Sequence, residues 1–135
     1  MQIKKFLLLV CLLVSSVSCE EGDDGLEGKW QLREMRYDDK VVKVDTVFYN
    51  FQFGVFQLQA FNRIPIAVNS VIGSYVIAED TIKMDIEPSF ANDLHALKFY
   101  YDWDKPSAKF HIDKHSASKL HLMREDEVLF VFRKF

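Results

Sequence analysis

The chain has 135 residues, of which 49% are hydrophobic and 27% are charged, a balance typical of one globular domain and not of a disordered chain. The formal net charge is −3, and loss of Lys4 and Lys5 with the leader described below would lower it to −5, so nucleic acid is excluded as the expected partner. Aromatic residues make up 14% and are mostly phenylalanine, whereas glycine and proline are scarce, which favours an all-β fold.

Residues 1–18 have the pattern of a signal peptide. Two lysines precede an apolar run over residues 6–14, which is shorter than the roughly twenty residues that a membrane-spanning helix needs. Small residues then lead to Cys19, and Ser16-Val17-Ser18-Cys19 resembles the bacterial lipobox, with serine where leucine is usual. The resemblance implies cleavage before Cys19 and attachment of acyl chains such as palmitate to it. The alternative is a stray thiol near an ordinary cleavage site.

Cysteine usage is consistent with lipid attachment. Cys11 lies inside the apolar run and would leave with it, so the exported chain would keep Cys19 alone and form no internal disulfide. Residues 19–26 are acidic, contain two glycines, and predict a flexible tether. They also resemble the acidic export tags of Gram-negative surface lipoproteins, with a plain charged spacer as the alternative. The expected location is the bacterial outer membrane, exposed on the cell surface or facing the periplasm.

From residue 27 onward, alternating apolar and polar residues predict strands joined by hairpins. The apolar parity changes after Leu32, which predicts a bulge near Arg33-Glu34. It changes again at Gly54, which indicates a second bulge or a sharp bend, with a plain hairpin turn as the alternative. The strictest alternation, over residues 81–86, predicts a strand with one buried and one wet face.

Residues 88–105 differ from the rest. Phe90, Leu94, Leu97 and Tyr101 recur at helical spacing and predict a short helix packed on the sheet, with an exposed aromatic loop at a barrel mouth as the alternative. The segments add up to about eight antiparallel strands, the number that closes into an up-and-down barrel without free edges. The predicted organisation is a signal peptide (1–18), a tether (19–26) and a β-barrel with one short helix (27–135).

Gly28 and Trp30 in the first strand, together with Arg133 in the last, resemble the lipocalin pattern. In that family the tryptophan plugs one end of the barrel and an arginine of the final strand packs over its ring. With the lipobox, the Ile-Gly-x-Tyr strand at residues 72–75 and the C-terminal Phe-Arg-Lys-Phe, nearly the whole mature chain resembles the compact lipocalin-like lipoproteins of Gram-negative bacteria. The resemblance implies a calycin-type barrel and leaves the ligand open.

The last predicted hairpin raises a metal hypothesis. His111 and His121 are expected to lie opposite each other, with Asp113 on the same face and His115 near by. That face is solvated and nothing enforces a ligand geometry, so a polar surface is the better interpretation, and no metal or other cofactor is expected. The sequence offers no nucleophile elbow and no phosphate-binding glycine loop, so no enzyme activity is expected.

Function is predicted from the aromatic and apolar residues on inward parities. The candidate cavity lining consists of Phe51, Phe53, Phe56, Leu58, Tyr75 and Met84. The leading hypothesis is a membrane-anchored lipoprotein that binds a small apolar or amphipathic ligand in the barrel interior or mouth. In the alternative, these side chains fill the barrel and the protein is a non-catalytic interaction module or accessory subunit of an outer-membrane or cell-surface complex, with a protein partner.

Overall fold

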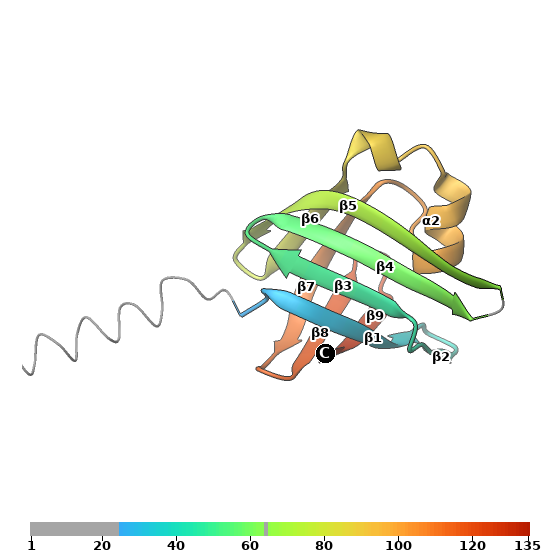
Figure 1. Ribbon diagram of the computed structural model, residues 1–135. Coiled ribbons are helices and arrows are strands. Elements are labelled where there is room, and N and C mark those ends of the chain that lie inside the picture. Colours follow the sequence, from blue (N-terminus) through green and yellow to red (C-terminus); the bar gives the residue numbers. More distant parts are fainter. Residues whose placement is uncertain (1–24, 64) are drawn as a thin grey trace, which may run out of the picture.

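The strands of this chain form one antiparallel sheet that closes on itself (Figure 1). The computed structural model describes residues 25–63 and 65–135. The strands are β1 Gly28–Arg36, β2 Val41–Lys43, β3 Val47–Gln52, β4 Val55–Arg63, β5 Ile66–Ala78, β6 Thr81–Ile86, β7 Ser107–His115, β8 Lys119–Arg124 and β9 Leu129–Lys134. They are hydrogen-bonded in the order β2-β1-β3-β4-β5-β6-β7-β8-β9, and β1 also pairs with β9. The predicted eight-stranded barrel is confirmed, with β2 as a short addition that pairs with the end of β1.

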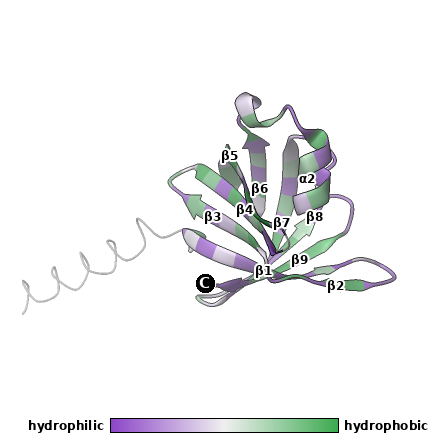
Figure 2. Cartoon of the chain, turned by 45° about the vertical axis from the view of Figure 1, so that its right-hand side comes forward, coloured by the Kyte–Doolittle hydropathy of each residue, from purple (hydrophilic) through white to green (hydrophobic). Residues whose placement is uncertain are grey.

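The alternation of side chains along the strands separates a core from a wet surface. Figure 2 shows hydrophilic and hydrophobic residues following one another along strands such as β3 and β4. Inward positions are aromatic or aliphatic and outward positions are mostly polar, as the two-residue period requires. Part of β3 is covered on both sides, because the outward Phe48 packs against Phe61 and Phe135.

Two bulges interrupt the regular pairing. One lies between Leu32 and Glu34 of β1, where the sequence predicts it, and the other lies between Ile112 and Lys114 of β7. Each bulge adds one residue to its strand and so reverses the faces of the residues that follow. In β7 the reversal turns Lys114 outward beside its partner His121 and His115 inward to the end of the barrel.

The parity change at Gly54 has a different cause from the bulge or bend that the sequence indicates. Phe53 and Gly54 have φ angles of 49° and 80° and form the tight turn that joins β3 to β4. A two-residue hairpin favours such positive φ values because they match the strand twist. The plain hairpin turn, kept above as the alternative, is therefore the observed structure.

The predicted helix is present but is shorter than its apolar spacing suggests. A 3₁₀ turn at Pro88–Phe90 precedes helix α2, Leu94–Tyr101. The Asp93 side chain caps the first turn, and Asp102 ends the helix in the left-handed conformation. No helix among the described residues is long and apolar enough to cross a membrane.

The packed domain begins slightly before its predicted boundary. Leu26, assigned above to the tether, is buried in the barrel core, and its carbonyl accepts a hydrogen bond from the Trp30 indole. The predicted signal peptide and the predicted lipidation site Cys19 lie outside the described residues.

Candidate functional site

Each end of the barrel is occupied by a tryptophan. At the end where the chain enters β1, Trp30 is fully buried, and its Nε1 donates to the carbonyl of Leu26 at 2.8 Å. The Lys134 ammonium lies 4.5 Å from the Trp30 ring centroid, and the His115 ring meets the indole edge-on at 6.1 Å. We call this the closed end.

The cation on Trp30 is Lys134 and not Arg133, so the predicted role of Arg133 is wrong. Inward and outward positions alternate along β9, and Lys134 is both on the inward parity and the direct cross-strand partner of Trp30. Arg133 faces outward and is exposed. Gly28 fits its predicted structural role: its φ is +115°, and a Cβ there would stand 2.4 Å from the Lys134 ammonium.

The opposite end, which we call the mouth, is filled from the connection between β6 and β7 (Figure 1). Trp103 follows α2, is buried, and donates from Nε1 to the Tyr49 hydroxyl at 3.0 Å. Its ring lies 6.2 Å from that of Phe56 and 6.3 Å from that of Phe110. The hydroxyl of Tyr101, the last residue of α2, donates to the Asn69 side chain at 2.8 Å. We call residues 94–103 the plug, because they supply apolar volume to the mouth from outside the sheet.

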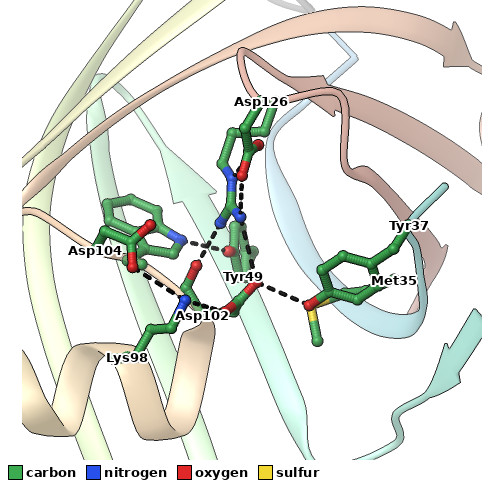
Figure 3. A network of polar contacts seen from close by, with 9 residues as sticks. Met35, Tyr37, Tyr49, Lys98, Asp102, Asp104 and Asp126 are labelled. Atoms are coloured by element: carbon green, nitrogen blue, oxygen red, sulfur yellow. Dashed lines mark hydrogen bonds and ion pairs between the residues drawn. The ribbon is translucent and has the colours of Figure 1, made fainter. Parts of the chain in front are cut away.

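A polar network around Asp102 fastens the plug to the rim (Figure 3). The Asp102 carboxylate accepts hydrogen bonds from the Tyr37 hydroxyl at 2.8 Å and from Lys98 Nζ at 2.8 Å. Arg124, at the end of β8, binds both the carboxylate and the backbone carbonyl of Asp102. Its guanidinium also pairs with Asp126 at 2.8 Å and lies over the Phe130 ring at 4.9 Å. The residue that follows β1 and the last residue of β8 are therefore joined to the plug through one carboxylate.

The electrostatics of this network favour a charged Asp102. Burial opposes its ionisation, yet hydrogen bonds from Lys98 and Tyr37 and the charge of Arg124 lower the pKa of Asp102. Burial and the hydrogen bond to Asp102 raise the pKa of Tyr37 to about 12. Tyr37 thus remains a hydrogen-bond donor at any physiological pH. Burial also raises the pKa of Tyr49, the acceptor for Trp103.

An open pocket of about 160 Å³ adjoins the plug. Trp103 and Ala108 form its apolar wall, and Arg124 and Asp126 border it on the charged side. Its remaining lining comes from the start of β7 and the β8–β9 turn. A recess with one apolar and one charged wall matches the two parts of an amphipathic molecule.

The barrel interior itself is filled. Of the predicted lining, Phe51, Phe56, Leu58 and Met84 are 0% exposed and Tyr75 is 7% exposed, all within one core. A water-sized void beside one of the first four side chains would leave part of its surface accessible. All four are 0% exposed, so no such void adjoins them. Phe53 is 78% exposed at the tip of the β3–β4 turn, so its predicted place in the lining is wrong. The turn reverses the chain at Phe53 and removes it from the inward row.

The helix of the plug was predicted, but the buried position of Trp103 and the network around Asp102 were missed. Trp103 belongs to no period, because it follows the helix and precedes β7, and the partners of Asp102 are distant in sequence. The signal that could have found them is Asp102-Trp103-Asp104, a large aromatic between two acids directly after an amphipathic segment.

His111, His115 and His121 do not lie together in one cluster. His111 lies 3.1 Å from Asp113, but its cross-strand partner is Met123 and not His121, which pairs with Lys114 nearer the hairpin turn. His115 lies at the closed end, where it bonds the Gly25 carbonyl at 2.7 Å. Among the described residues, no group of three or more potential ligands is placed to hold a metal ion.

Comparison with known proteins gives consistent matches. The model of a family described as a lipocalin-like domain matches residues 11–135. A solved lipocalin-like protein from Bacteroides uniformis is 34% identical with a TM-score of 0.75, and a solved uncharacterized protein from Bacteroides eggerthii is 31% identical with a TM-score of 0.73. Each alignment covers 82% of this chain and 99% of the other. None of the curated proteins matches.

Proposed function

This chain belongs to the family of lipocalin-like domains, and we propose that it is a lipid-anchored, non-catalytic protein that binds a small apolar or amphipathic molecule at the mouth of its barrel. Barrels of this size and type are in general a binding fold and not an enzyme fold. The proposed location is the outer membrane, reached through the signal peptide and the lipid on Cys19. The observation that carries the proposal is Trp103, a buried side chain delivered to the mouth by a connection and not by a strand.

A ligand gains room in this barrel by taking the place of the plug. At the closed end, the inward side chains belong to strands that are hydrogen-bonded to a neighbour on each side. Displacing these side chains would therefore open the barrel itself. The plug lies outside the sheet, and the contacts described above fasten it through side chains. Withdrawal of Trp103 would expose the rings of Phe56 and Phe110 and the hydroxyl of Tyr49. These groups form an apolar site with one polar atom, as small-molecule sites commonly do.

The two tryptophans provide the test, because they are the only ones in the sequence and occupy opposite ends of the barrel. In a Trp30→Phe protein, Trp103 is the sole indole and reports on the plug. In the matched Trp103→Phe protein, Trp30 reports on the closed end. Fluorescent fatty acids and other hydrophobic probes are titrated into both, and acid-extracted protein is examined by mass spectrometry for lipids retained during purification.

We expect probe binding to shift the emission of the Trp30→Phe protein to longer wavelength, as the indole leaves its buried position. The emission of the Trp103→Phe protein should stay unchanged. Failure of every probe to bind, or an equal response from both proteins, would contradict binding at the mouth.

The filled interior favours a second candidate function, a protein-interaction module. Exposed apolar side chains lie on the outer face of β4 and β5, with Val55 and Val76 at one end of the strand pair and Val68 and the 90% exposed Ile66 at the other. Exposed apolar patches commonly mark interaction surfaces. Absence of probe binding, together with recovery of one specific membrane partner that Ile66→Ser and Val68→Ser abolish, would establish this function in place of the first.

A further inference from the structure

A second recess lies on the outer wall of the barrel, and its lining is strongly basic. It is an open groove of about 570 Å³ that runs from the β7–β8 turn across β9 to the second half of β1. The residues that line it are Arg33, Arg36, Lys114, Ser118, Lys119, His121, Val131, Phe132 and Arg133. Five are permanently cationic and none is acidic, although the whole chain has a formal charge of −3. We call this the basic groove.

Most of these cations are not neutralised by neighbours. Within the part of the chain that the structure describes, no ion pair is formed by Lys114, Lys119 or Arg133, and Arg33 donates only to the neutral Gln31. Arg36 is the exception, since it pairs with Glu34. Surface cations usually find acidic neighbours when both charges are abundant, as they are here. The groove therefore has capacity for an anion.

The sheet itself places like charges together. Lys119 of β8 and Arg133 of β9 are direct cross-strand partners with their side chains on the outer face, an arrangement that disfavours the sheet. Lys83 and Lys109 are also cross-strand partners, so a pair of like charges does not by itself define a binding site. The first pair differs because the bulge in β7 brings Lys114 to the same face, beside His121. Bulges often re-aim side chains next to functional sites.

The pKa of His121 reflects these positive charges. Burial together with the positive charges of Lys114, Arg36 and Lys119 lowers its pKa. The negative charge that opposes this shift is that of Asp113, which is already engaged with His111 at 3.1 Å. A bound anion would offset this repulsion and return the His121 pKa towards its ordinary value.

We propose that the basic groove binds oxyanions, namely the phosphate or sulfate groups of an anionic ligand. Arg33 and Arg133 supply forked N–H donors that match a tetrahedral oxyanion, and Lys114 and Lys119 supply point charges. The Ser118 hydroxyl and the His121 ring complete the set of possible donors. Two sources offer this chemistry: the headgroups of anionic lipids and soluble phosphorylated or sulfated molecules.

The position of the groove favours lipid headgroups, an inference that rests on the proposed anchor at Cys19. The turn that ends the groove follows His115, which binds the carbonyl of Gly25. Gly25 lies six positions after Cys19, a length of chain that reaches at most about 20 Å. A membrane-held Cys19 would thus keep the groove near the lipid surface and leave the mouth on the far side of the barrel.

The test uses the barrel without its leader, so that the anchor makes no contribution. The two crystallised relatives consist almost entirely of this barrel, since 99% of each chain is covered, which indicates that it folds alone. Binding is measured by sedimentation with vesicles of phosphatidylcholine alone or mixed with phosphatidylglycerol. In a second arm, inorganic phosphate and glucose 6-phosphate are added while the His121 ring resonance is titrated by NMR.

The decisive variant is Lys119→Gln/Arg133→Gln, both exposed. The control, Lys83→Gln/Arg63→Gln, removes one lysine and one arginine that are also exposed and lie outside the groove, although Arg63 pairs with Asp45. We expect loss of the groove cations to weaken binding to anionic vesicles roughly twentyfold and the control to change it little. Binding should also fall as salt rises.

Each outcome is informative. Anionic-vesicle binding that depends on the groove supports the proposal with lipid headgroups as the source. A raised His121 pKa with glucose 6-phosphate, without vesicle binding, supports it with a soluble source. No response in either arm, or equal loss in both variants, overturns it. None of these results depends on whether the mouth binds an apolar ligand or Cys19 carries lipid.

Discussion

Replacing Lys134 with methionine is expected to lower the free energy of unfolding by about 1–2.5 kcal/mol, and the same replacement at Arg133 by less than about 0.5 kcal/mol. The Lys134 ammonium lies over the Trp30 ring and donates to the carbonyl of Glu27 at 2.5 Å. At a half-exposed position the cation–π contact contributes about 0.5–1 kcal/mol and the hydrogen bond about 0.5–1.5 kcal/mol. Methionine retains an unbranched apolar stem, so the loss isolates the ammonium group.

The two variants differ by one position and by the face of β9 on which they lie. Urea unfolding measures both free energies without the screening that guanidinium salt would add. The melting temperature of the Lys134 variant should fall by about 3–6 °C for each kcal/mol lost in a domain of this size. A double-mutant cycle with Trp30→Leu should give a coupling energy of about 0.5–1 kcal/mol for Lys134 and none for Arg133.

The refuting result is specific. If Arg133→Met destabilises the barrel as much as Lys134→Met, or if Arg133 and not Lys134 couples to Trp30, then strand parity has not decided which cation packs on the tryptophan. The alternation of inward and outward residues in β9 would then be misassigned, and with it the place of Arg133 in the basic groove.

Three further outcomes test the fold and the plug. Phe51→Ala should cost about 3–5 kcal/mol in a urea titration, because its ring is fully buried, whereas Phe53→Ala at the exposed turn should cost less than about 0.5 kcal/mol. Gly28→Ala should lower stability by at least about 1 kcal/mol in the same assay, because its φ is positive and a methyl group would meet Lys134. Asp102 has a lowered pKa, so its contribution is complete above its ordinary pKa and is lost as the pH falls through the lowered pKa. The stability difference between wild type and Asp102→Asn should therefore be largest near neutral pH and shrink on acidification, and a constant difference would contradict this.

The barrel could be predicted from the sequence because its causes are local. A two-residue period fixes which side chains face inward, and one break in that period after Leu32 locates the bulge that the structure contains. The role of Trp30 could also be predicted. A large aromatic residue on the inward face at the start of the first strand fills the end of the barrel at which that strand begins. Local rules failed at Gly54, where a turn and a bulge produce the same parity change.

The plug and the choice between Arg133 and Lys134 required geometry that a pattern does not contain. The partners of Asp102 are Tyr37 and Arg124, which are 65 and 22 residues away along the chain. Which cation meets Trp30 depends on the register of β1 against β9, and this register is set only when the barrel closes. The register of β7 against β8 likewise pairs His111 with Met123 and His121 with Lys114, and the spacing of the two histidines does not reveal this.

The two ends of the barrel are fastened by different chemistry, and this predicts where the structure opens. At the closed end, the side chains of Trp30, His115 and Lys134 bind backbone carbonyls of residues 25–27, which tie the entering chain to three strands. At the mouth, the plug is held by the buried side chains of Leu97, Tyr101 and Trp103 and by the ion pairs and hydrogen bonds of Asp102. Only the ion pairs of Asp102 weaken with salt or acid. Local opening occurs where few independent interactions must be lost. We therefore expect amide hydrogens of α2 to exchange faster than those of β1 and β9, with added salt accelerating exchange in α2 selectively. An α2 that exchanges as slowly as β1 would mean that the mouth does not open on its own, and that any ligand must enter by another route.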